Sequence, residues 1–374
     1  MKSTLGIIFT YKYEEDLKTL TQLRSIASIP FGGRYRIIDF ILSSMVNSGI
    51  TKIGMITRTN YSSLMDHVGS GKEWDLARKK DGLYILPPFS NPASVNYATN
   101  FRGRMEALAN ITNFIRRSSE EYVLMTDADM ITNMTFDDML AQHIEKNADI
   151  TLLYKKGNFT NESYSQFCFL SLDEDEKVTD VTINPAMDRN NLSVGTLIIR
   201  KSLLESLIQQ CSSHNLYGFR RDVLQAHLHD LKIYGYECRN YFNIITSIAS
   251  YFDSNMELLN DDVRRVLFID NNSIFTTIRD EVPTEYRNDS VVSNSLIADG
   301  CLIEGTVENS IIFRGVHVRK GAIVQNSILM QDTEIQSGSQ INYVIADKDV
   351  VIRQNRKLFG YQKFPTVLSK GSLV

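Results

Sequence analysis

The chain has 374 residues, which is long enough for two domains and a sizeable core. Its charged fraction of 22% is that of an ordinary globular protein, and its net charge of −4 argues against nucleic-acid binding because no strong positive field is available. No apolar stretch approaches the roughly 20 residues of a membrane span, so we expect no membrane insertion, and no signal peptide is expected either. The four cysteines are scattered without a C-x-x-C pair, which indicates reduced thiols in a cytoplasmic protein.

The first 260 residues alternate short apolar runs with amphipathic segments. The runs are typical of buried parallel strands, which we expect at residues 5–9, 50–56, 122–126 and 150–154. Helices are expected at residues 40–48, 105–117 and 139–146. This βαβα order predicts an open α/β sheet that binds ligands at the carboxyl ends of its strands.

A second pattern follows a connector that we expect at residues 261–288. A unit of Asn, Ser and two aliphatic residues at 294–297 recurs at 309–312 and 326–329, and more loosely at 342–345. Aliphatic residues also recur at six-residue intervals, as in the series Ile312, Val318, Val324 and Met330. This periodicity predicts a parallel β-helix over residues 289–374, in which each coil buries its apolar side chains on the next. The alternative is an antiparallel all-β domain.

Residues 30–40 read Pro-Phe-Gly-Gly-Arg-Tyr-Arg-Ile-Ile-Asp-Phe. This string resembles the signature of the ADP-glucose pyrophosphorylases, or glucose-1-phosphate adenylyltransferases, which make the sugar donor for glycogen and starch. The resemblance extends in order over nearly the whole chain. It implies a Rossmann-like, GT-A-like nucleotidyltransferase domain over residues 1–260 and a C-terminal left-handed parallel β-helix of hexapeptide repeats.

The glycine-rich phosphate loop of that family is missing. The family pattern G-G-G-x-G-T-R-L-x-P-L-T holds the triphosphate, but here no glycine occurs between Gly6 and Gly32. A phosphate cradle needs backbone N–H groups that point at the anion, which glycine permits. Tyrosines obstruct that approach, and three acidic residues repel the phosphates at the same place: Tyr11, Tyr13, Glu14, Glu15 and Asp16.

The resemblance also implies that metal ligands and cations of the reaction are lost. Asp129 matches the family's first magnesium ligand, but Ile244 stands at the second, and isoleucine cannot coordinate Mg²⁺. Ile26 and Asn184 replace two lysines that contact the phosphates, and each lost contact costs about 1.5–3 kcal/mol. We therefore expect no catalytic residue and no metal in this chain, with Mg²⁺ only in an active partner subunit.

Other residues of the family's pocket remain. Gly103 and Glu106 lie in a run that resembles the nucleotide-contacting Y-x-G-T-A-D-A-V, although Arg104 replaces a small residue there. Ser193 and Gly195 lie in a run that resembles the S-M-G of the sugar pocket. These residues are expected either to line a nucleotide or sugar-phosphate pocket or only to preserve the fold.

The family also binds sugar-phosphate effectors between its two domains. Six cations are candidates for such an anion site, with solvated surface charge as the alternative: Arg34, Arg36, Arg353, Arg356, Lys357 and Lys363.

Several separate losses that affect one reaction predict a subunit without activity of its own. The resemblance to non-catalytic, D-type subunits implies that the chain modulates an active paralogue in a hetero-tetramer during glycogen synthesis. Two alternatives stay open: a weakly active adenylyltransferase with a rebuilt phosphate site, and a sensor of sugar phosphates or nucleotides.

Overall fold

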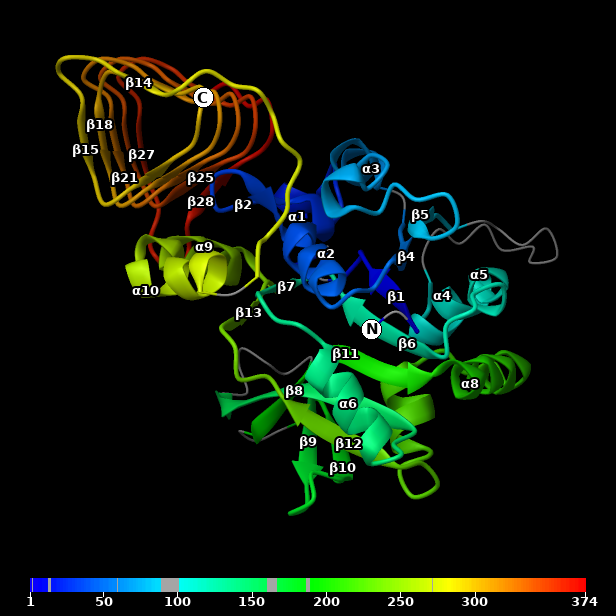
Figure 1. The fold of residues 1–374 in the computed structure, drawn as a ribbon. Helices are drawn as coiled ribbons and strands as arrows, with labels where there is room; N and C mark the ends of the chain where they lie inside the picture. The colour runs from blue at the N-terminus through cyan, green and yellow to red at the C-terminus, as the bar shows by residue number, and fades with distance from the viewer. Residues whose placement is uncertain are drawn as a thin grey trace.

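The structure is a computed structural model that describes residues 1, 3–12, 15–58, 60–88, 101–159, 167–185, 189–270 and 272–374. An α/β domain is followed by a β-helix that projects from one side of it (Figure 1). Helices α9 (Ile248–Met256) and α10 (Asp261–Arg264) lie at the junction of the two domains. Within the described ranges, no helix has the length and apolar character needed to cross a membrane.

A nine-stranded mixed sheet forms the centre of the α/β domain. Its path is β10-β9-β11-β6-β1-β4-β5, with β8 beside β11 and β12 beside β8. The strands β6, β1, β4 and β5 are parallel, and β11 is antiparallel to β6. Their bounds are β1 (Thr4–Phe9), β4 (Lys52–Ile56), β5 (Gly82–Leu86), β6 (Tyr122–Asp127), β8 (Ile150–Phe159), β9 (Cys168–Leu172), β10 (Val178–Ile183), β11 (Arg189–Arg200) and β12 (Ile233–Glu237). Two small sheets pair β2 (Pro30–Phe31) with β3 (Tyr35–Arg36) and β7 (Met130–Thr132) with β13 (Phe242–Ile244).

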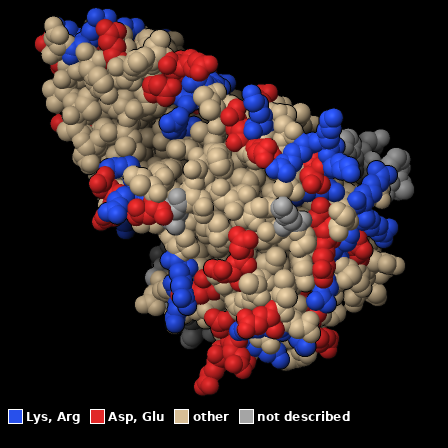
Figure 2. Space-filling view, in the orientation of Figure 1, with Lys and Arg blue, Asp and Glu red and all other residues tan. Residues whose placement is uncertain are grey.

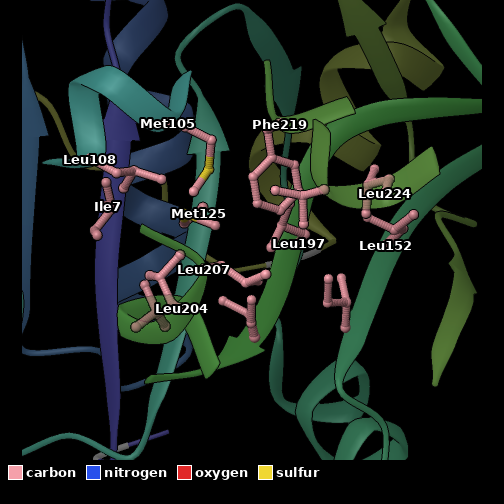
Figure 3. Close-up of a cluster of buried hydrophobic side chains, with 14 of the residues drawn as sticks. Ile7, Met105, Leu108, Met125, Leu152, Leu197, Leu204, Leu207, Phe219 and Leu224 are labelled. Atoms are coloured by element: carbon pink, nitrogen blue, oxygen red, sulfur yellow. The ribbon is translucent and has the colours of Figure 1, made fainter. Parts of the chain in front are cut away.

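Both faces of this sheet are buried. Leu5 and Ile7 of β1 pack in one hydrophobic cluster, whereas Ile8 packs in a second cluster on the opposite face. Figure 3 shows the first cluster, in which Leu108 and Leu204 approach Ile7 from helices. Two-sided burial explains why these strands are continuous apolar runs.

The α-helices of this domain before the junction are α1 (Lys18–Thr21), α2 (Ile37–Asn47), α3 (Ser62–Val68), α4 (Arg104–Asn110), α5 (Thr112–Arg116), α6 (Asp137–Glu145) and α8 (Lys201–Ser213). The 3₁₀ or π segments are η1 (Ile26–Ser28), η2 (Lys72–Trp74), η3 (Phe219–Gln225), η4 (Glu257–Leu259) and η5 (Arg265–Ile269).

The expected strands and helices of the α/β domain are confirmed, with shifted ends. The helix expected at 40–48 begins earlier, because Asp39 accepts a hydrogen bond from the backbone N–H of Arg36 and so caps α2. The helix expected at 105–117 is two helices, α4 and α5, which meet at Ile111. Here the hydroxyl of Thr112 donates to the carbonyl of Ala109 at 2.8 Å, a side-chain bond that bends helices.

The parallel β-helix is confirmed, and its first strand begins at Glu285, within the expected connector. Its three faces are five-stranded parallel sheets, β14-β17-β20-β23-β26, β15-β18-β21-β24-β27 and β16-β19-β22-β25-β28. Aliphatic side chains fill the interior. In the view of Figure 2, one flank of the β-helix carries few charged side chains, whereas charges of both signs are interspersed over the α/β domain.

The strands of the β-helix are β14 (Glu285–Tyr286), β15 (Val291–Ser293), β16 (Leu296–Ile297), β17 (Leu302–Ile303), β18 (Thr306–Glu308), β19 (Ile311–Ile312), β20 (His317–Val318), β21 (Ile323–Gln325), β22 (Ile328–Leu329), β23 (Glu334–Ile335), β24 (Gln340–Asn342), β25 (Val344–Ala346), β26 (Val351–Ile352), β27 (Lys357–Phe359) and β28 (Thr366–Leu368).

The repeated Asn-Ser unit forms a turn in each coil. Asn309 and Asn326 adopt left-handed backbone conformations, with φ of 45° and 44°, which asparagine tolerates better than most residues. The hydroxyl of Ser310 accepts a hydrogen bond from the N–H of Ser327, one coil later. In the loosest repeat, Tyr343 rather than Asn342 takes the left-handed conformation, with φ of 54°.

A third hydrophobic cluster, here called the shared core, joins the two domains. It combines buried side chains of the α/β domain with Ile311, Phe313, Ile328, Met330 and Ile345 of the β-helix. Tyr343 contacts Phe252 of α9 in the same region, with ring centres 6.1 Å apart.

Candidate functional site

A cleft of about 1110 Å³ opens at the carboxyl ends of β1 and β6, where open α/β sheets bind ligands. Its walls come from the segment after β1, from residues 101–104 and from residues 215–222. Among the described residues of its lining, basic side chains outnumber acidic ones: Lys12, Arg58, Arg102, Arg104, Arg220 and Arg221 against Glu15, Asp16, Asp127 and Asp222. The cleft therefore favours negatively charged ligands.

A lysine and two aspartates meet at one side of this cleft. Phe9 of β1 is opposite Asp127 of β6, so the segment after β1 lies beside the end of β6. The ammonium of Lys12 lies 3.0 Å from Oδ2 of Asp127 and 3.0 Å from Oδ2 of Asp129. The Lys12 side chain is 21% exposed, whereas those of the aspartates are 4% and 1% exposed. We call these three residues the Lys12 cluster.

Arg104 adds a second cation. Its Nη2 donates to Oδ1 of Asp127 at 2.6 Å, and its Nη1 donates to the carbonyl of Gly195 at 3.1 Å. Gly195 has φ of 81°, and a Cβ at this position would lie 2.5 Å from Oδ2 of Asp127. Glycine is therefore required for β11 to come this close to the carboxylate. Arg104 therefore links α4 to β6 and β11.

These cations determine the charge of Asp127. Burial opposes its ionisation, but Arg104 and Lys12 outweigh burial and lower the pKa of Asp127 to about 2. At Asp129 burial has the largest effect and the net pKa is raised, because Lys12 only partly offsets burial and the neighbouring charge of Asp127.

The Lys12 cluster does not fit a divalent metal ion. Mg²⁺ takes oxygen ligands at about 2.0–2.1 Å in octahedral geometry, and here an ammonium stands between the carboxylates. Ile244 does lie near Asp129, because the next residue, Ile245, donates its N–H to the carbonyl of Asp129 at 2.8 Å. The Ile244 side chain packs against hydrophobic clusters and offers no oxygen. Across the described ranges, no three His, Cys, Asp or Glu side chains are grouped as metal ligands.

Aromatic and acidic side chains lie where the phosphate loop of the family is expected. Tyr11 contacts the rings of Phe9 and Phe101, and the Arg58 guanidinium carbon lies 4.3 Å from its ring centre. Burial raises the pKa of Tyr11, so its hydroxyl stays neutral. Glu15 and Asp16 are exposed and line the same cleft. Tyr13 and Glu14 lie outside the described residues.

The expected pocket residues are only partly brought together. Gly103 lines the cleft, but the space beside its Cα is closed by Tyr217, whose carbonyl oxygen would lie 2.1 Å from a Cβ. Glu106 pairs with Arg102 and is not among the described residues that line the cleft. Ser193 is buried within β11, where it pairs with Tyr154 and Cys168.

The two positions at which a lysine is missing lie in different surroundings. Asn184 is exposed directly after β10, beside Ile183 of the cleft lining. Ile26 is completely buried in the shared core. A lysine side chain at position 26 would place its charge in that core. In this chain, position 26 therefore does not face a ligand.

A second, smaller hollow, here called the interdomain cavity, lies between the domains. The described residues that line it include one carboxylate, Asp66, and five cations: Arg34, Arg36, Arg279, Arg314 and Lys348. The other four cations expected in the anion site are exposed near the end of the β-helix and are not among its described lining residues: Arg353, Arg356, Lys357 and Lys363. Of the six cations expected in an anion site, Arg34 and Arg36 therefore lie together at this cavity, and the other four do not join them.

The cations of the interdomain cavity repel one another. Burial, aided by the charges of Arg36 and Arg24, lowers the pKa of Lys348 to about 8. Burial also lowers the pKa of Arg36 to about 10, although the charge of Asp39 opposes this. A bound anion would relieve both effects.

Several cations of these sites were not expected, among them Lys12, Arg279, Arg314 and Lys348. A signal for two of them exists in the coil period. Ser310 and Ser327 bond to each other 17 residues apart, and the same interval relates Arg314, Gln331 and Lys348, which all line the interdomain cavity. Lys12 has no such signal, because its partners come from a distant part of the chain.

Comparison with known proteins agrees with this architecture. Residues 15–292 match the family model of the nucleotidyl transferases, and residues 281–363 match the GlmU-like, C-terminal hexapeptide model. The chain is 35% identical over 369 residues to the glycogen biosynthesis protein GlgD of Bacillus subtilis, with 98% of this chain and 96% of the relative covered. It is 37% identical over 324 residues to GlgD of Geobacillus stearothermophilus, with 86% and 82% covered. A glucose-1-phosphate adenylyltransferase of Geobacillus stearothermophilus is 33% identical over 313 residues, with 83% and 80% covered.

Proposed function

Because the chain belongs to the nucleotidyl transferase family, in the group of glucose-1-phosphate adenylyltransferases and GlgD proteins, we propose that it is a non-catalytic, regulatory subunit of glycogen biosynthesis. An active paralogous subunit would form ADP-glucose and pyrophosphate from ATP and glucose 1-phosphate with its own Mg²⁺. This chain would bind that subunit in a hetero-tetramer and change its kinetics.

The Lys12 cluster is the observation that carries this proposal. Nucleotidyl transfer needs a metal held by carboxylates and donors for the phosphates. In this chain Asp127 and Asp129 are paired with Lys12 and Arg104. Ile244 adds no oxygen ligand beside these carboxylates. Tyr11 lines the cleft where the phosphate loop of the family is missing. The surroundings of these carboxylates oppose the reaction rather than support it.

The test is pyrophosphate release from ATP and glucose 1-phosphate with Mg²⁺. We expect no turnover by this chain alone, and an altered maximal rate or substrate affinity when it is mixed with its active paralogue. The Asp129→Ala variant serves as the matched control, because modulation through subunit contacts should persist without this carboxylate. Turnover by the chain alone that Asp129→Ala abolishes would instead establish a weak adenylyltransferase, and identical partner kinetics with and without the chain would refute regulation.

The interdomain cavity supports a further part of the proposal, an anionic sugar-phosphate effector. Arg34 and Arg36 of the α/β domain, Arg279 of the connector and two β-helix cations converge there. An anion bound among them would contact both domains at once and so favour one arrangement of the subunit.

The effector site is tested by thermal unfolding with inorganic phosphate and with a sugar bisphosphate, since ligands of the folded state stabilise it. We expect a concentration-dependent rise in Tm that Lys348→Met reduces. Lys357→Met is the matched control, because Lys357 is exposed and outside the cavity. Equal responses of the two variants would contradict this site.

A further inference from the structure

We propose that the Lys12 ammonium is a built-in replacement for a divalent cation, so that the chain binds no metal ion between Asp127 and Asp129 unless Lys12 is removed. This inference goes beyond the proposed regulatory role and does not rest on it, because it concerns only this chain's own cation.

The first argument is position. Nζ of Lys12 lies 3.0 Å from one oxygen of each aspartate, so it occupies the space that an ion bound by both carboxylates would need. A metal ion at that point would draw each oxygen about 1 Å closer, since ammonium–oxygen contacts are longer than Mg²⁺–oxygen bonds. The ring of Phe167 has its centre 5.6 Å from Nζ and gives the ammonium a further, aromatic contact.

The second argument is charge. Two carboxylates, of Asp127 and Asp129, face two cations, Lys12 and Arg104. These four charges balance when both acids are ionised, and Arg220 places a further cation near Asp127. A divalent ion would add two positive charges directly beside an ammonium in a site where the aspartates are almost completely buried, and repulsion between buried like charges is strong.

The third argument is that the carboxylate oxygens could still bind a metal ion if Lys12 were absent. Asp129 is 0% exposed, and its Oδ1 has no hydrogen-bond donor among the described residues. Buried carboxylate oxygens without a donor are unusual. If Lys12 were removed, Asp129 would lose the ion pair that it makes with this lysine, and a metal ion would then gain two buried carboxylate oxygens.

The experiment measures Mn²⁺ binding to the full chain by electron paramagnetic resonance, with Mn²⁺ as the probe. The unmodified chain should show no site in the cleft, and Lys12→Ala should gain one that binds about tenfold tighter or more than any background site. Lys12→Arg keeps the positive charge and should gain nothing. The double variant Lys12→Ala/Asp129→Asn should lose the gained site.

Two results would overturn the proposal. One is Mn²⁺ binding by the unmodified chain that Asp129→Asn abolishes, because the ammonium would then not exclude the metal. The other is a folded Lys12→Ala chain, checked by circular dichroism, that gains no Mn²⁺ site. If Lys12→Ala does not fold, Lys12→Met takes its place, because it keeps the aliphatic stem. The comparison of Mn²⁺ binding by the unmodified chain and by Asp129→Asn does not depend on whether the alanine variant folds.

Discussion

The guanidinium of Arg24 and the carboxylate of Asp347 form an ion pair across the boundary between the two domains. Nη2 of Arg24 lies 2.7 Å from Oδ1 of Asp347, and the two side chains are 4% and 2% exposed. Oδ1 of Asp347 also accepts the N–H of Lys348, which lines the interdomain cavity. The pair therefore links the segment after α1 to the coil that supplies part of the cation cluster.

Removing one partner of this pair should destabilise the protein strongly. Asp347→Ala leaves Arg24 as an uncompensated buried charge, and we expect a loss of about 3–5 kcal/mol in the free energy of unfolding, measured by urea denaturation. The double variant Arg24→Met/Asp347→Leu should recover most of this loss, because an apolar pair carries no such charge. A double variant as unstable as Asp347→Ala would contradict the assignment of the loss to the unpaired charge.

Deprotonation of Lys348 should make the protein more stable at alkaline pH. Its pKa is lowered to about 8 in the folded chain, mainly by burial and by Arg36. Between pH 8 and the ordinary lysine value of about 10.4, the unfolded chain binds more protons than the folded chain. The free energy of unfolding should therefore rise with pH in this window. Below pH 8, where Lys348 is charged in both states, the full cost of burying its charge should apply. Lys348→Met should flatten the rise, which denaturant titrations at several pH values would detect.

His143 should make the protein less stable at acidic pH. Burial, with a contribution from Arg200, lowers its pKa to about 4, and its Nδ1 lies 2.8 Å from the hydroxyl oxygen of Thr151. Below about pH 6.5 the unfolded chain takes up a proton that the folded chain does not, so stability should fall as pH decreases from 6.5 towards 4. His143→Gln should weaken this dependence in thermal unfolding. His214→Gln, at an exposed position, is the matched control and should leave it in place.

The turns of the β-helix should depend on asparagine. Asn326 has φ of 44°, and its Nδ2 donates to Oδ1 of Asn342 at 2.9 Å. Asn326→Ala should cost about 1–2 kcal/mol, because alanine adopts the left-handed conformation poorly. Asn326→Gly loses the same side-chain bond without this strain, so it should be the more stable of the two variants in urea denaturation. Equal stabilities would show that the side-chain bond, not the backbone conformation, matters at this turn.

Much of the fold could be predicted because its signals are local. The apolar runs of β1 and β6 are buried on both faces, and the Asn-Ser unit marks turns that occur once in each coil. The break at Ile111 was missed because the hydroxyl of Thr112 bonds to the backbone within an otherwise regular helical pattern. The fourth turn falls at Tyr343 and not at Asn342, because the strand register pairs positions 17 residues apart and so places Tyr343 one coil after Asn326.

The candidate site could be predicted only in part. The absence of glycine before Gly32 and the isoleucine at position 244 are visible in the sequence. The pairing of Lys12 with Asp129 joins residues 117 positions apart, and it follows from the parallel pairing of β1 with β6. Arg353 and Lys357 do not line the interdomain cavity for a related reason, since the coil register decides which cations face the α/β domain.

The shared core has a consequence for how the chain comes apart. Ile26 and Phe40 of one domain and Phe313 and Met330 of the other belong to the same buried cluster, so neither domain can open without exposing apolar surface of its neighbour. Heating should therefore give a single calorimetric peak rather than two. A protease that cuts the exposed connector near Ile278 should leave two fragments that stay associated until the whole molecule melts. The two domains differ in topology, but they should unfold together as one cooperative unit.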